Sequence, residues 1–382
     1  MPRPEPPSLF SSAPLPVAKL NAGLIRSENV GPVAFRELIN RYGGAQKALD
    51  ALPEISRRAG SKRPIRICPR DAAEAELEAA ARAGAEPVFM IEPGYPPALA
   101  AIDTPPPLLY VKGRRDVLLK PGIAIVGSRL CSAAGAKLAG LFAHRLGEAG
   151  YAVVSGLARG IDGAAHMAAL ATGTIAVLAG GIDVIYPPEH DGLYDQIASD
   201  GCLVSEMPPG FKPRGQDFPR RNRIISGISL GVIIVEAAAR SGTLITPRYA
   251  NEQGRDVFAV PGHPLDPRAE GTNKLIKTGA TLVTEADDVL QALEPISGLR
   301  DGGARLRWQP VETLPDADVP PPILGERDYQ MVLSALGPAP VDVDAVMRAT
   351  GLSTRAVQIA LMELDLAGLI TRPCTGLIAR RD

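Results

Sequence analysis

The sequence has few cysteines, few aromatic residues and almost no net charge. Its 382 residues include four cysteines and one tryptophan, aromatic residues make up 4%, and the formal net charge is −1 at pH 7. There is no Cys-x-x-Cys pair and no histidine at ligand spacing, so neither a zinc site nor a disulfide framework is expected. Because charge is balanced, any site for a polyanion must be local. We expect small buried side chains in a reducing compartment for Cys68, Cys131, Cys202 and Cys374.

Long hydrophobic runs are also missing. No apolar stretch approaches the roughly 18 residues of a membrane span, and GVIIVEAAA and TIAVLAGG have the length of buried strands. The N-terminal segment is rich in proline and lacks the apolar core of a secretory signal, so residues 1–16 are interpreted as a disordered leader. These features predict a cytoplasmic protein that is not held in a membrane.

The rest of the chain divides into segments of different periodicity. Helical spacing of apolar residues predicts a small N-terminal helical domain over residues 17–70. In residues 71–295, short apolar runs come to alternate with helical segments, which is typical of an α/β fold with a doubly wound parallel sheet. Residues 296–324 are rich in proline, aspartate and glycine and are interpreted as a linker. Residues 325–382 carry three helical patterns and two β-prone pieces, which predicts a winged helix.

The individual strands of the α/β domain are visible as apolar runs. The first expected strand is LLYVKG, and those after Gly122 are GIAIVG, YAVVSG, TIAVLAGG, CLVSE, GVIIVEA, DVFAVPG and ATLVT. Helices are expected between them near residues 133–149, 163–170, 193–199, 222–228, 244–253, 272–277 and 286–293.

The turns that follow these strands carry the first candidate binding residues. In an open parallel sheet, ligands bind beyond the carboxyl ends of the strands. Glycines there let a phosphate approach the backbone, hydroxyl groups donate to it, and arginine can contact two of its oxygens. No turn reads G-x-G-x-x-G or G-x-x-x-x-G-K-[ST], and the alternative is that the glycines only make tight turns. The candidates are Gly127, Ser128, Arg129, Ser155, Gly156, Gly160, Ser241, Gly242 and Thr243.

A basic stretch, FKPRGQDFPRRNRIISGIS, is the most informative segment. Cations beside an aromatic ring are what a groove for single-stranded nucleic acid requires, because the cations bind phosphates and the ring stacks on bases. The alternative is a solvated basic loop. The candidate residues are Lys212, Phe218, Arg221, Asn222 and Arg223, with Arg214 and Arg220 adding charge.

Acid–base chemistry has weaker support in the sequence. Asp162 and His166 are one helical turn apart, which is the spacing of a possible acid–base pair. An aspartate that caps a helix and a histidine that packs on the sheet are, however, the more common explanation of such residues. No serine or cysteine stands at a recognisable nucleophile elbow. Glu236, at a strand end, is expected to hold a nearby arginine. We therefore predict no catalytic residue, no metal and no cofactor.

Several longer strings carry a resemblance to a known family. VGSR, VVSGLARGIDGAAHMAAL, IAVLAGGIDVIYP, LVSEMPPG, FPRRNRIISGIS, VEAAARSGTLITPRYA, VFAVPG and GTNKLIKTGA follow one another between Gly122 and Thr284. In this order they resemble the DNA-processing protein A family, also called Smf, of bacterial natural transformation. The resemblance implies an extended Rossmann fold that binds single-stranded DNA without strong sequence preference, protects incoming strands, forms a homodimer and helps to load the RecA recombinase.

The resemblance also assigns roles to residues of this sequence. It implies that Arg129 and the turn from Ser155 to Gly160 hold phosphates, that Phe218 stacks on bases, and that the residues from Arg221 to Arg223 line the same groove. Residues 241–243 would complete its floor, and Lys274 of GTNKLIKTGA is a further candidate contact.

The two flanking domains fit the same family. The N-terminal segment resembles a sterile-alpha-motif-like or helix-hairpin-helix-like module, and the C-terminal segment resembles the family's winged helix. Its expected recognition helix, STRAVQIALMELDLAGL, has one cation, Arg355, against Glu363 and Asp365. A surface that reads DNA should be basic, so we expect this domain to contact protein or to be a retained accessory.

Two other functions stay open at this point. A nucleotide-processing hydrolase, similar to lysine-decarboxylase-like phosphoribohydrolases, would need a PGGxGT turn, and the turns here read AGGIDV and PGHPLD. A winged-helix regulator with a nucleotide-sensing Rossmann domain is the third hypothesis, and the acidic recognition helix argues against it.

Overall fold

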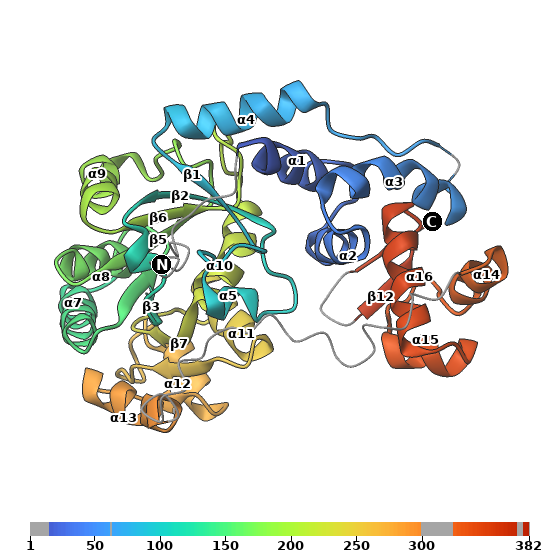
Figure 1. Ribbon diagram of the computed structural model, residues 1–382. Helices are drawn as coiled ribbons and strands as arrows, with labels where there is room; N and C mark the ends of the chain where they lie inside the picture. Colours follow the sequence, from blue (N-terminus) through green and yellow to red (C-terminus); the bar gives the residue numbers. More distant parts are fainter. Residues whose placement is uncertain (1–14, 62, 299–323, 373–376, 382) are drawn as a thin grey trace, which may run out of the picture. The chain divides into compact units, whose positions relative to one another are not determined.

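The computed structural model describes residues 15–61, 63–298, 324–372 and 377–381 (Figure 1). Their contacts divide them into two compact units: one contains the described part of Glu76–Arg307, and the other combines those of Ala13–Ala75 and Trp308–Asp382. Most of the expected leader and linker, with Trp308 and Cys374, lies outside the described residues. No helix within the described ranges is long and apolar enough to cross a membrane.

The first unit is built on a nine-stranded sheet with the order β1-β2-β6-β5-β4-β3-β7-β8-β9. Seven of these strands are parallel neighbours, and their apolar runs were all indicated by the sequence. They are continuous because helices cover both faces of the sheet. The parallel strands are β3 (Gly122–Val126), β4 (Ala152–Ser155), β5 (Thr174–Leu178), β6 (Cys202–Ser205), β7 (Ser229–Ile234), β8 (Asp256–Ala259) and β9 (Thr281–Leu282).

Two further strands extend one edge of the sheet. β2 (Leu108–Gly113), which the sequence indicated, pairs antiparallel with β6, and β1 (Glu86–Phe89) pairs antiparallel with β2. β1 was not foreseen, because EPVF is too short and too partly exposed to show a period. The short helices α5 (Pro97–Ala100) and α6 (Arg115–Leu118) lie before and after β2 in the chain.

The strand order reverses between β3 and β7. From β3 the chain builds β4, β5 and β6 in one direction, and from β7 it builds β8 and β9 in the other. Such a reversal leaves a crevice beyond the carboxyl ends of the two central strands, where ligands of open α/β sheets bind. The expected Rossmann-like architecture is therefore confirmed. A ligand site is expected beyond the carboxyl ends of β3 and β7.

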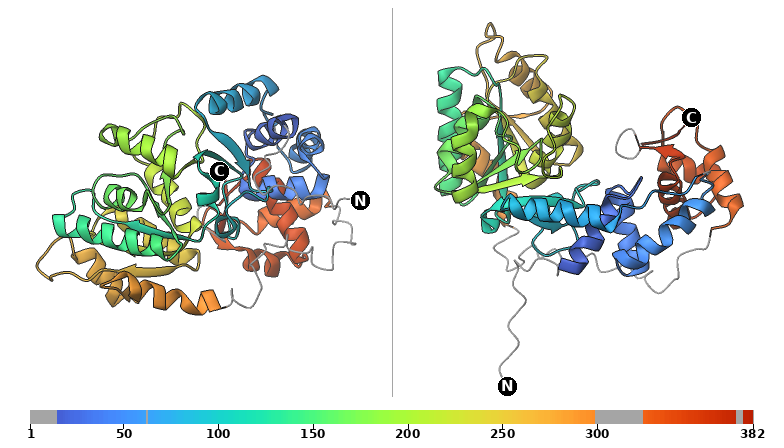
Figure 2. Two further views of the ribbon diagram at one scale, coloured as in Figure 1. Left: turned by 60° about the vertical axis from the view of Figure 1, so that its left-hand side comes forward. Right: turned by 90° about the horizontal axis from the view of Figure 1, so that it is seen from above.

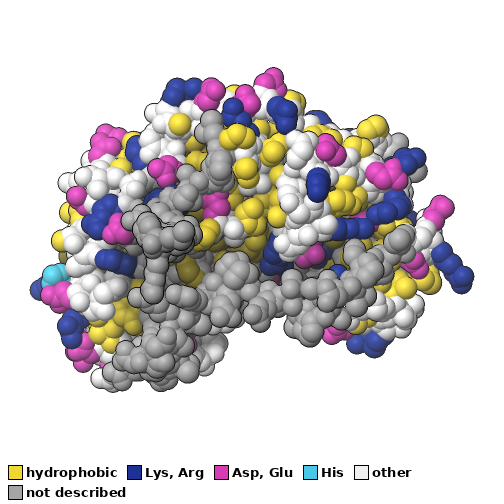
Figure 3. Space-filling model, in the orientation of Figure 1, with side chains coloured by type: hydrophobic (Ala, Val, Ile, Leu, Met, Phe, Trp, Pro, Cys, Tyr) yellow, Lys and Arg dark blue, Asp and Glu magenta, His cyan; other side chains and the backbone are white. Residues whose placement is uncertain are grey.

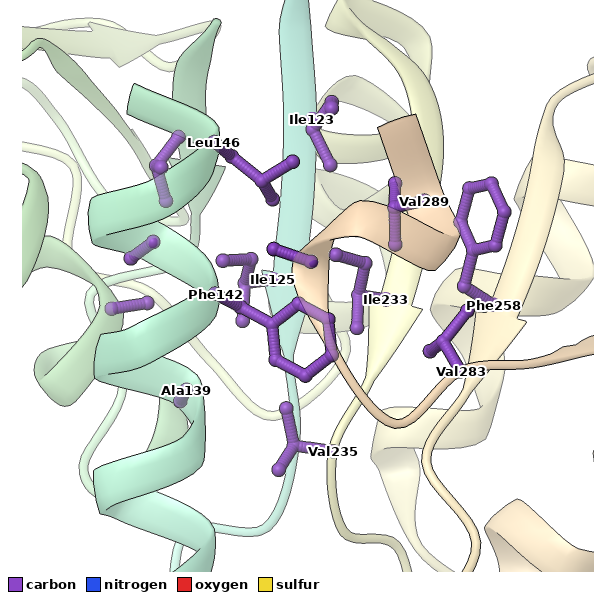
Figure 4. Close-up of a cluster of buried hydrophobic side chains, with 14 of the residues drawn as sticks. Ile123, Ile125, Ala139, Phe142, Leu146, Ile233, Val235, Phe258, Val283 and Val289 are labelled. Carbon is purple, nitrogen blue, oxygen red and sulfur yellow. The ribbon is translucent and has the colours of Figure 1, made fainter. Parts of the chain in front are cut away.

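Helices cover both faces of this sheet (Figure 2). On one face α7 (Ala133–Glu148), α8 (Ile161–Ala169) and α13 (Ala286–Gly298) enclose a core in which Phe142 and Leu146 meet Ile125 and Val289 (Figure 4). α10 (Asp217–Ile228) and α11 (Ile245–Glu252) pack on the other. The remaining elements of this unit are η1 (Pro188–His190), α9 (Asp191–Asp200), η2 (Gly242–Leu244) and α12 (Glu270–Lys277).

The second unit joins segments from the two ends of the chain. α1 (Leu15–Ile25), α2 (Pro32–Tyr42) and α3 (Ala45–Arg58) form the N-terminal helical module, and α4 (Arg70–Arg82) leads into the first unit. The C-terminal part contains α14 (Glu326–Ser334), α15 (Val343–Thr350) and α16 (Thr354–Leu366), with β10 (Val341–Asp342), β11 (Ile370–Thr371) and β12 (Leu377–Arg380) in one small sheet. Three helices and this sheet confirm the winged helix.

Candidate nucleic-acid interface

A cavity of about 700 Å³ lies at the reversal of strand order in the first unit. Its walls come from the turn after β3, the turn after β7 and the first half of α10, as the topology predicts. A second cavity, of about 320 Å³, shares several of these residues and adds Gly156. The predicted residues brought together in the larger cavity are Gly127, Ser128, Arg129, Phe218, Arg221, Asn222, Ser241, Gly242 and Thr243.

A cluster of three side chains borders both cavities. The guanidinium carbon of Arg129 lies 5.4 Å from the centroid of the Phe218 ring, and the Tyr186 ring lies 5.2 Å from Phe218 at 53°. The three residues come from the turn after β3, the loop after β5 and the start of α10. Arg129 is exposed and Tyr186 is 47% exposed, so aromatic and cationic groups face solvent together. Such a group can stack on a base and neutralise a phosphate at once.

Tyr186 is the functional candidate that sequence reasoning missed. It stands in the string IDVIYP, which carries part of the family resemblance but has no lysine or arginine beside its aromatic ring. An aromatic ring beside a proline at the end of an apolar run was the available signal. Only the fold brings it next to Phe218, which is more than thirty residues away in sequence.

Arg221 supports the floor of the cavities from within the protein. Its side chain is buried, its Nη1 donates to the carbonyl oxygens of Gly156, at 2.7 Å, and Val177, and its Nε donates to Asn222 Oδ1 at 3.2 Å. Burial lowers the pKa of Arg221 to about 10, and the neighbouring Asp162 opposes that shift. Arg221 therefore fixes the turn after β4 and lends its charge to the cavity from below.

Asp162 holds the same turn from the other side. Its Oδ2 accepts the backbone N–H groups of Gly156, at 3.0 Å, and Ala158, at 3.4 Å. Burial raises the pKa of Asp162, while Arg221 and these N–H groups act in the opposite direction. The carboxylate is thus occupied in shaping the turn before α8. The cap of α8 is Gly160, so the capping role expected of Asp162 is replaced by this one.

Three of the predicted glycines are required by close packing. A Cβ on Gly127 would lie 2.5 Å from the Ile161 side chain, and one on Gly156 would lie 2.6 Å from Arg221 Nη2. Gly160 has a φ of +73°, and a Cβ there would lie 2.3 Å from the Ser128 carbonyl oxygen. These positions fit the alternative that the glycines make tight turns. Gly242 differs, since a Cβ there would meet nothing within 4 Å.

The predicted hydroxyl groups mostly hold the turns to one another. Ser155 Oγ donates to the Ile125 carbonyl oxygen at 2.6 Å, and Thr243 Oγ1 donates to that of Gly127 at 3.0 Å. Ser241 Oγ accepts the Thr243 N–H at 3.2 Å. Ser128 Oγ accepts the Leu130 N–H at 3.1 Å, which leaves its own O–H able to donate. The turns after β3 and β7 are therefore tied into one rim.

Other predicted contacts lie outside the walls of both cavities. Arg223 Nη2 pairs with Glu206 at 2.6 Å and its Nη1 donates to the Thr104 carbonyl oxygen at 2.9 Å, with 13% of its side chain exposed. Side chains two residues apart on a helix point about 200° apart around its axis. Arg223 therefore faces away from the surface that Arg221 faces. Lys212 and Lys274 are exposed, and they too are absent from the residues that line the two cavities.

The residues considered for acid–base chemistry have structural partners. His166 is fully buried, its Nε2 accepts the Leu157 N–H at 3.3 Å, and its Nδ1 lies 2.7 Å from Thr174 Oγ1. Burial lowers the pKa of His166 to about 3. Glu236 accepts the backbone N–H of Ser132 at 2.9 Å and also its hydroxyl group. The expected arginine partner of Glu236 is therefore replaced by a serine that begins α7.

The cysteines only partly fit their expected environment. Cys202 is buried, and burial raises its pKa to about 12, while Cys68 and Cys131 are partly exposed. Within the described ranges, no group of three or more histidine, cysteine, aspartate or glutamate side chains could hold a metal ion. On the face shown in Figure 3, basic and acidic side chains are interspersed, so charge of one sign gathers only locally.

Comparison with known proteins assigns three parts of the chain to described domains. The family model described as DNA recombination-mediator protein A matches residues 86–294. Two further models, described as a DprA-like N-terminal HHH domain and a DprA winged helix domain, match residues 22–79 and 315–373. These matches agree with the helical module, the Rossmann-like domain and the winged helix seen in the structure.

Individual proteins are similar over most of the chain. Protein Smf of Escherichia coli (strain K12) is 42% identical over 291 residues, which cover 75% of this chain and 75% of that protein. Putative DNA processing protein DprA of Mycobacterium tuberculosis (strain CDC 1551 / Oshkosh) is 34% identical over 369 residues, 93% of this chain and 88% of that protein. The X-ray structure of DNA processing protein A from Streptococcus pneumoniae is 39% identical, covers 72% of this chain and 95% of that chain, and has a TM-score of 0.61.

Proposed function

The chain belongs to the DNA-processing protein A (Smf) family, and from this premise we propose that it binds single-stranded DNA without strong sequence preference. The proposed site is the pair of cavities at the reversal of strand order. The observation that carries the proposal is the partly exposed cluster of Arg129, Phe218 and Tyr186 at their shared border.

The chemistry of this border supports a strand of DNA as the ligand. Aromatic faces accept every base, and arginine neutralises any phosphodiester, so neither selects a sequence. A mononucleotide site of the usual kind would carry a G-x-G-x-x-G or G-x-x-x-x-G-K-[ST] turn, and no turn of this sequence reads so. We assign the direct contacts to Arg129, Phe218, Tyr186, Ser128 and Gly242, with Arg221 contributing charge from beneath.

The cellular role is proposed on the basis of the family. We propose that the protein protects incoming strands in the cytoplasm, helps to load a RecA-type recombinase onto them during natural transformation, and acts as a homodimer through its Rossmann-like domain. A relative from Bacillus subtilis (strain 168), 46% identical over 202 residues, carries the name DNA processing protein DprA. We also propose a binding role without catalysis, because Asp162 and His166 are committed to the turn after β4.

A titration with three ligands tests the proposed function. Full-length protein is titrated into labelled oligothymidine, a duplex of equal length and nucleoside monophosphates, at several salt concentrations. We expect oligothymidine to bind most tightly and its affinity to fall with salt, by a log–log slope of about −0.7 for each phosphate contacted. Tighter binding of a nucleotide with turnover would instead identify a hydrolase, and preference for duplex would identify a regulator.

A further inference from the structure

The winged helix carries a buried glutamate whose two arginine partners come from the other end of the chain. Glu363, on α16, has no exposed side-chain surface. Its Oε1 accepts hydrogen bonds from Arg41 Nη1 at 2.6 Å and Arg58 Nη2 at 3.0 Å, and its Oε2 accepts the Tyr329 hydroxyl group. Arg41 lies on α2 and Arg58 ends α3, so both cations belong to the N-terminal module.

The side chains around Glu363 extend the same contact. Met362 and Leu366 are buried, yet neither belongs to the hydrophobic core of the winged helix, which is formed by residues such as Val357 and Leu361. Asn29 Nδ2 donates to the Leu366 carbonyl oxygen at 3.0 Å. Ala59, just after α3, packs into the winged-helix core itself. One face of α16 thus serves its own domain, and the face at Met362, Glu363 and Leu366 serves the N-terminal module.

Charge makes this face specific for its partner. A fully buried carboxylate is strongly unfavourable unless cations and hydrogen-bond donors compensate it. Arg41 and Arg58 supply two such donors, and the module that carries them is part of the same compact unit. In helix-turn-helix proteins the corresponding helix enters the major groove and its side chains contact base edges, whereas Glu363 is buried and paired with Arg41 and Arg58. α16 therefore suits an arginine-bearing helical partner and not a duplex.

We propose that the third helix of the winged helix is the docking surface for the N-terminal helical module of the same chain. The two modules form one discontinuous domain, and the Rossmann-like domain is an insertion between its halves. The function of the winged helix is then to hold the N-terminal module, with no direct reading of DNA. This inference does not depend on what the Rossmann-like domain binds.

Cutting the chain between the halves tests the proposal. A specific protease site is introduced into residues 299–323 of the full-length protein, and the chain is cut under native conditions. Gel filtration then shows whether the C-terminal fragment still elutes with the remainder. We expect it to be retained, because the contacts of Glu363 and Leu366 need no covalent connection. Release of the fragment from the otherwise unchanged protein at micromolar concentration would overturn the proposal.

Matched substitutions show whether this surface is responsible. E363Q is compared with D365N, because Asp365 lies on the same helix but pairs with Arg372 inside the winged helix. R58Q is compared with R57Q, because Arg57 is the preceding residue, is 77% exposed and pairs with Glu54. We expect E363Q and R58Q each to weaken retention of the fragment at least about tenfold, as breaking a buried charge pair does, and the controls to leave it unchanged.

The two sides of the contact give independent results. E363Q changes the winged helix and R58Q changes the N-terminal module, so a loss of retention with both variants cannot arise from damage to one domain. Circular dichroism of the uncut variants monitors their folding. Retention by R58Q and E363Q equal to that of R57Q and D365N would place the docking surface elsewhere and refute the proposal.

Discussion

Arg129 and Phe218 meet at the border that the two cavities share, with the guanidinium carbon 5.4 Å from the ring centroid. Eighty-nine positions of the sequence separate them, and the reversal of strand order between β3 and β7 brings them together. The cation is attracted to the face of the ring, and both side chains line the same cavity. This pair therefore combines the two interactions that a non-specific single-strand site needs.

Removing either member of the pair should weaken DNA binding in different ways. We expect Phe218→Ala to cost about 1–3 kcal/mol of oligothymidine binding, through lost stacking, with little change in salt dependence. Arg129→Ala should weaken binding of all sequences alike and reduce the salt slope by about one phosphate contact. Fluorescence anisotropy across a salt series measures both effects. Arg145→Ala is the control, since Arg145 is exposed on α7 and pairs with Asp287. Wild-type binding by Arg129→Ala would place the groove elsewhere.

Tyr186 provides a test of stacking that is separate from Phe218. Its ring is 47% exposed and lies 5.2 Å from Phe218, so it extends the aromatic surface that a base meets. We expect Tyr186→Phe to bind oligothymidine like the original protein, because the ring is kept. Tyr186→Ala should lose about 1–3 kcal/mol. The same anisotropy titration applies, and equal affinities for the two variants would show that this ring does not contact DNA.

Arg221 and its neighbour Arg220 should differ sharply in their effect on stability. Arg221 is buried against two carbonyl oxygens, whereas Arg220 has 58% of its side chain exposed and lies 3.6 Å from Glu206. Each carbonyl left without a donor in Arg221→Ala costs about 1–3 kcal/mol. We expect Arg220→Ala to change the free energy of unfolding by less than about 1 kcal/mol. Urea denaturation compares the two, and similar values for both variants would contradict the structural role of Arg221.

The sequence indicated the sheet well because its strands are buried on both faces. Runs such as GIAIVG are apolar at every position and do not alternate between apolar and polar residues, so they are easily identified as buried strands. Glycine-containing turns mark their ends. β1 escaped notice because its four residues, only half of them buried, carry no period. Order along the sheet is not encoded locally, so the meeting of Arg129, Tyr186 and Phe218 had to come from the fold.

The candidate site was indicated as a region but not residue by residue. Sequence spacing placed Arg221 and Arg223 together in a groove, whereas one is buried under the turn after β4 and the other pairs with Glu206. A one-dimensional pattern cannot say which cations face water. Glu363 shows the same limit, because its acidic character was visible and suggested a protein contact, but its arginine partners lie more than 300 residues away.

His166 should make the stability of the Rossmann-like domain depend on pH. Its pKa is about 3 in the folded protein, lowered by burial, against an ordinary value of 6.5. Between these values the unfolded chain binds a proton that the folded protein does not, so the stabilising contribution is complete above about pH 6.5 and is lost as the pH falls toward 3. His166→Gln removes this linkage.

The measurement is the free energy of unfolding, by urea denaturation, at several values between pH 4 and pH 7. We expect the stability of the original protein to fall more steeply with decreasing pH than that of His166→Gln, so that the two curves converge in acid. His144→Gln is the control, because 62% of the His144 side chain is exposed. It should keep the steep dependence of the original protein. Parallel curves for His166→Gln and the original protein would mean that His166 titrates normally, and hence that water reaches the turn after β4.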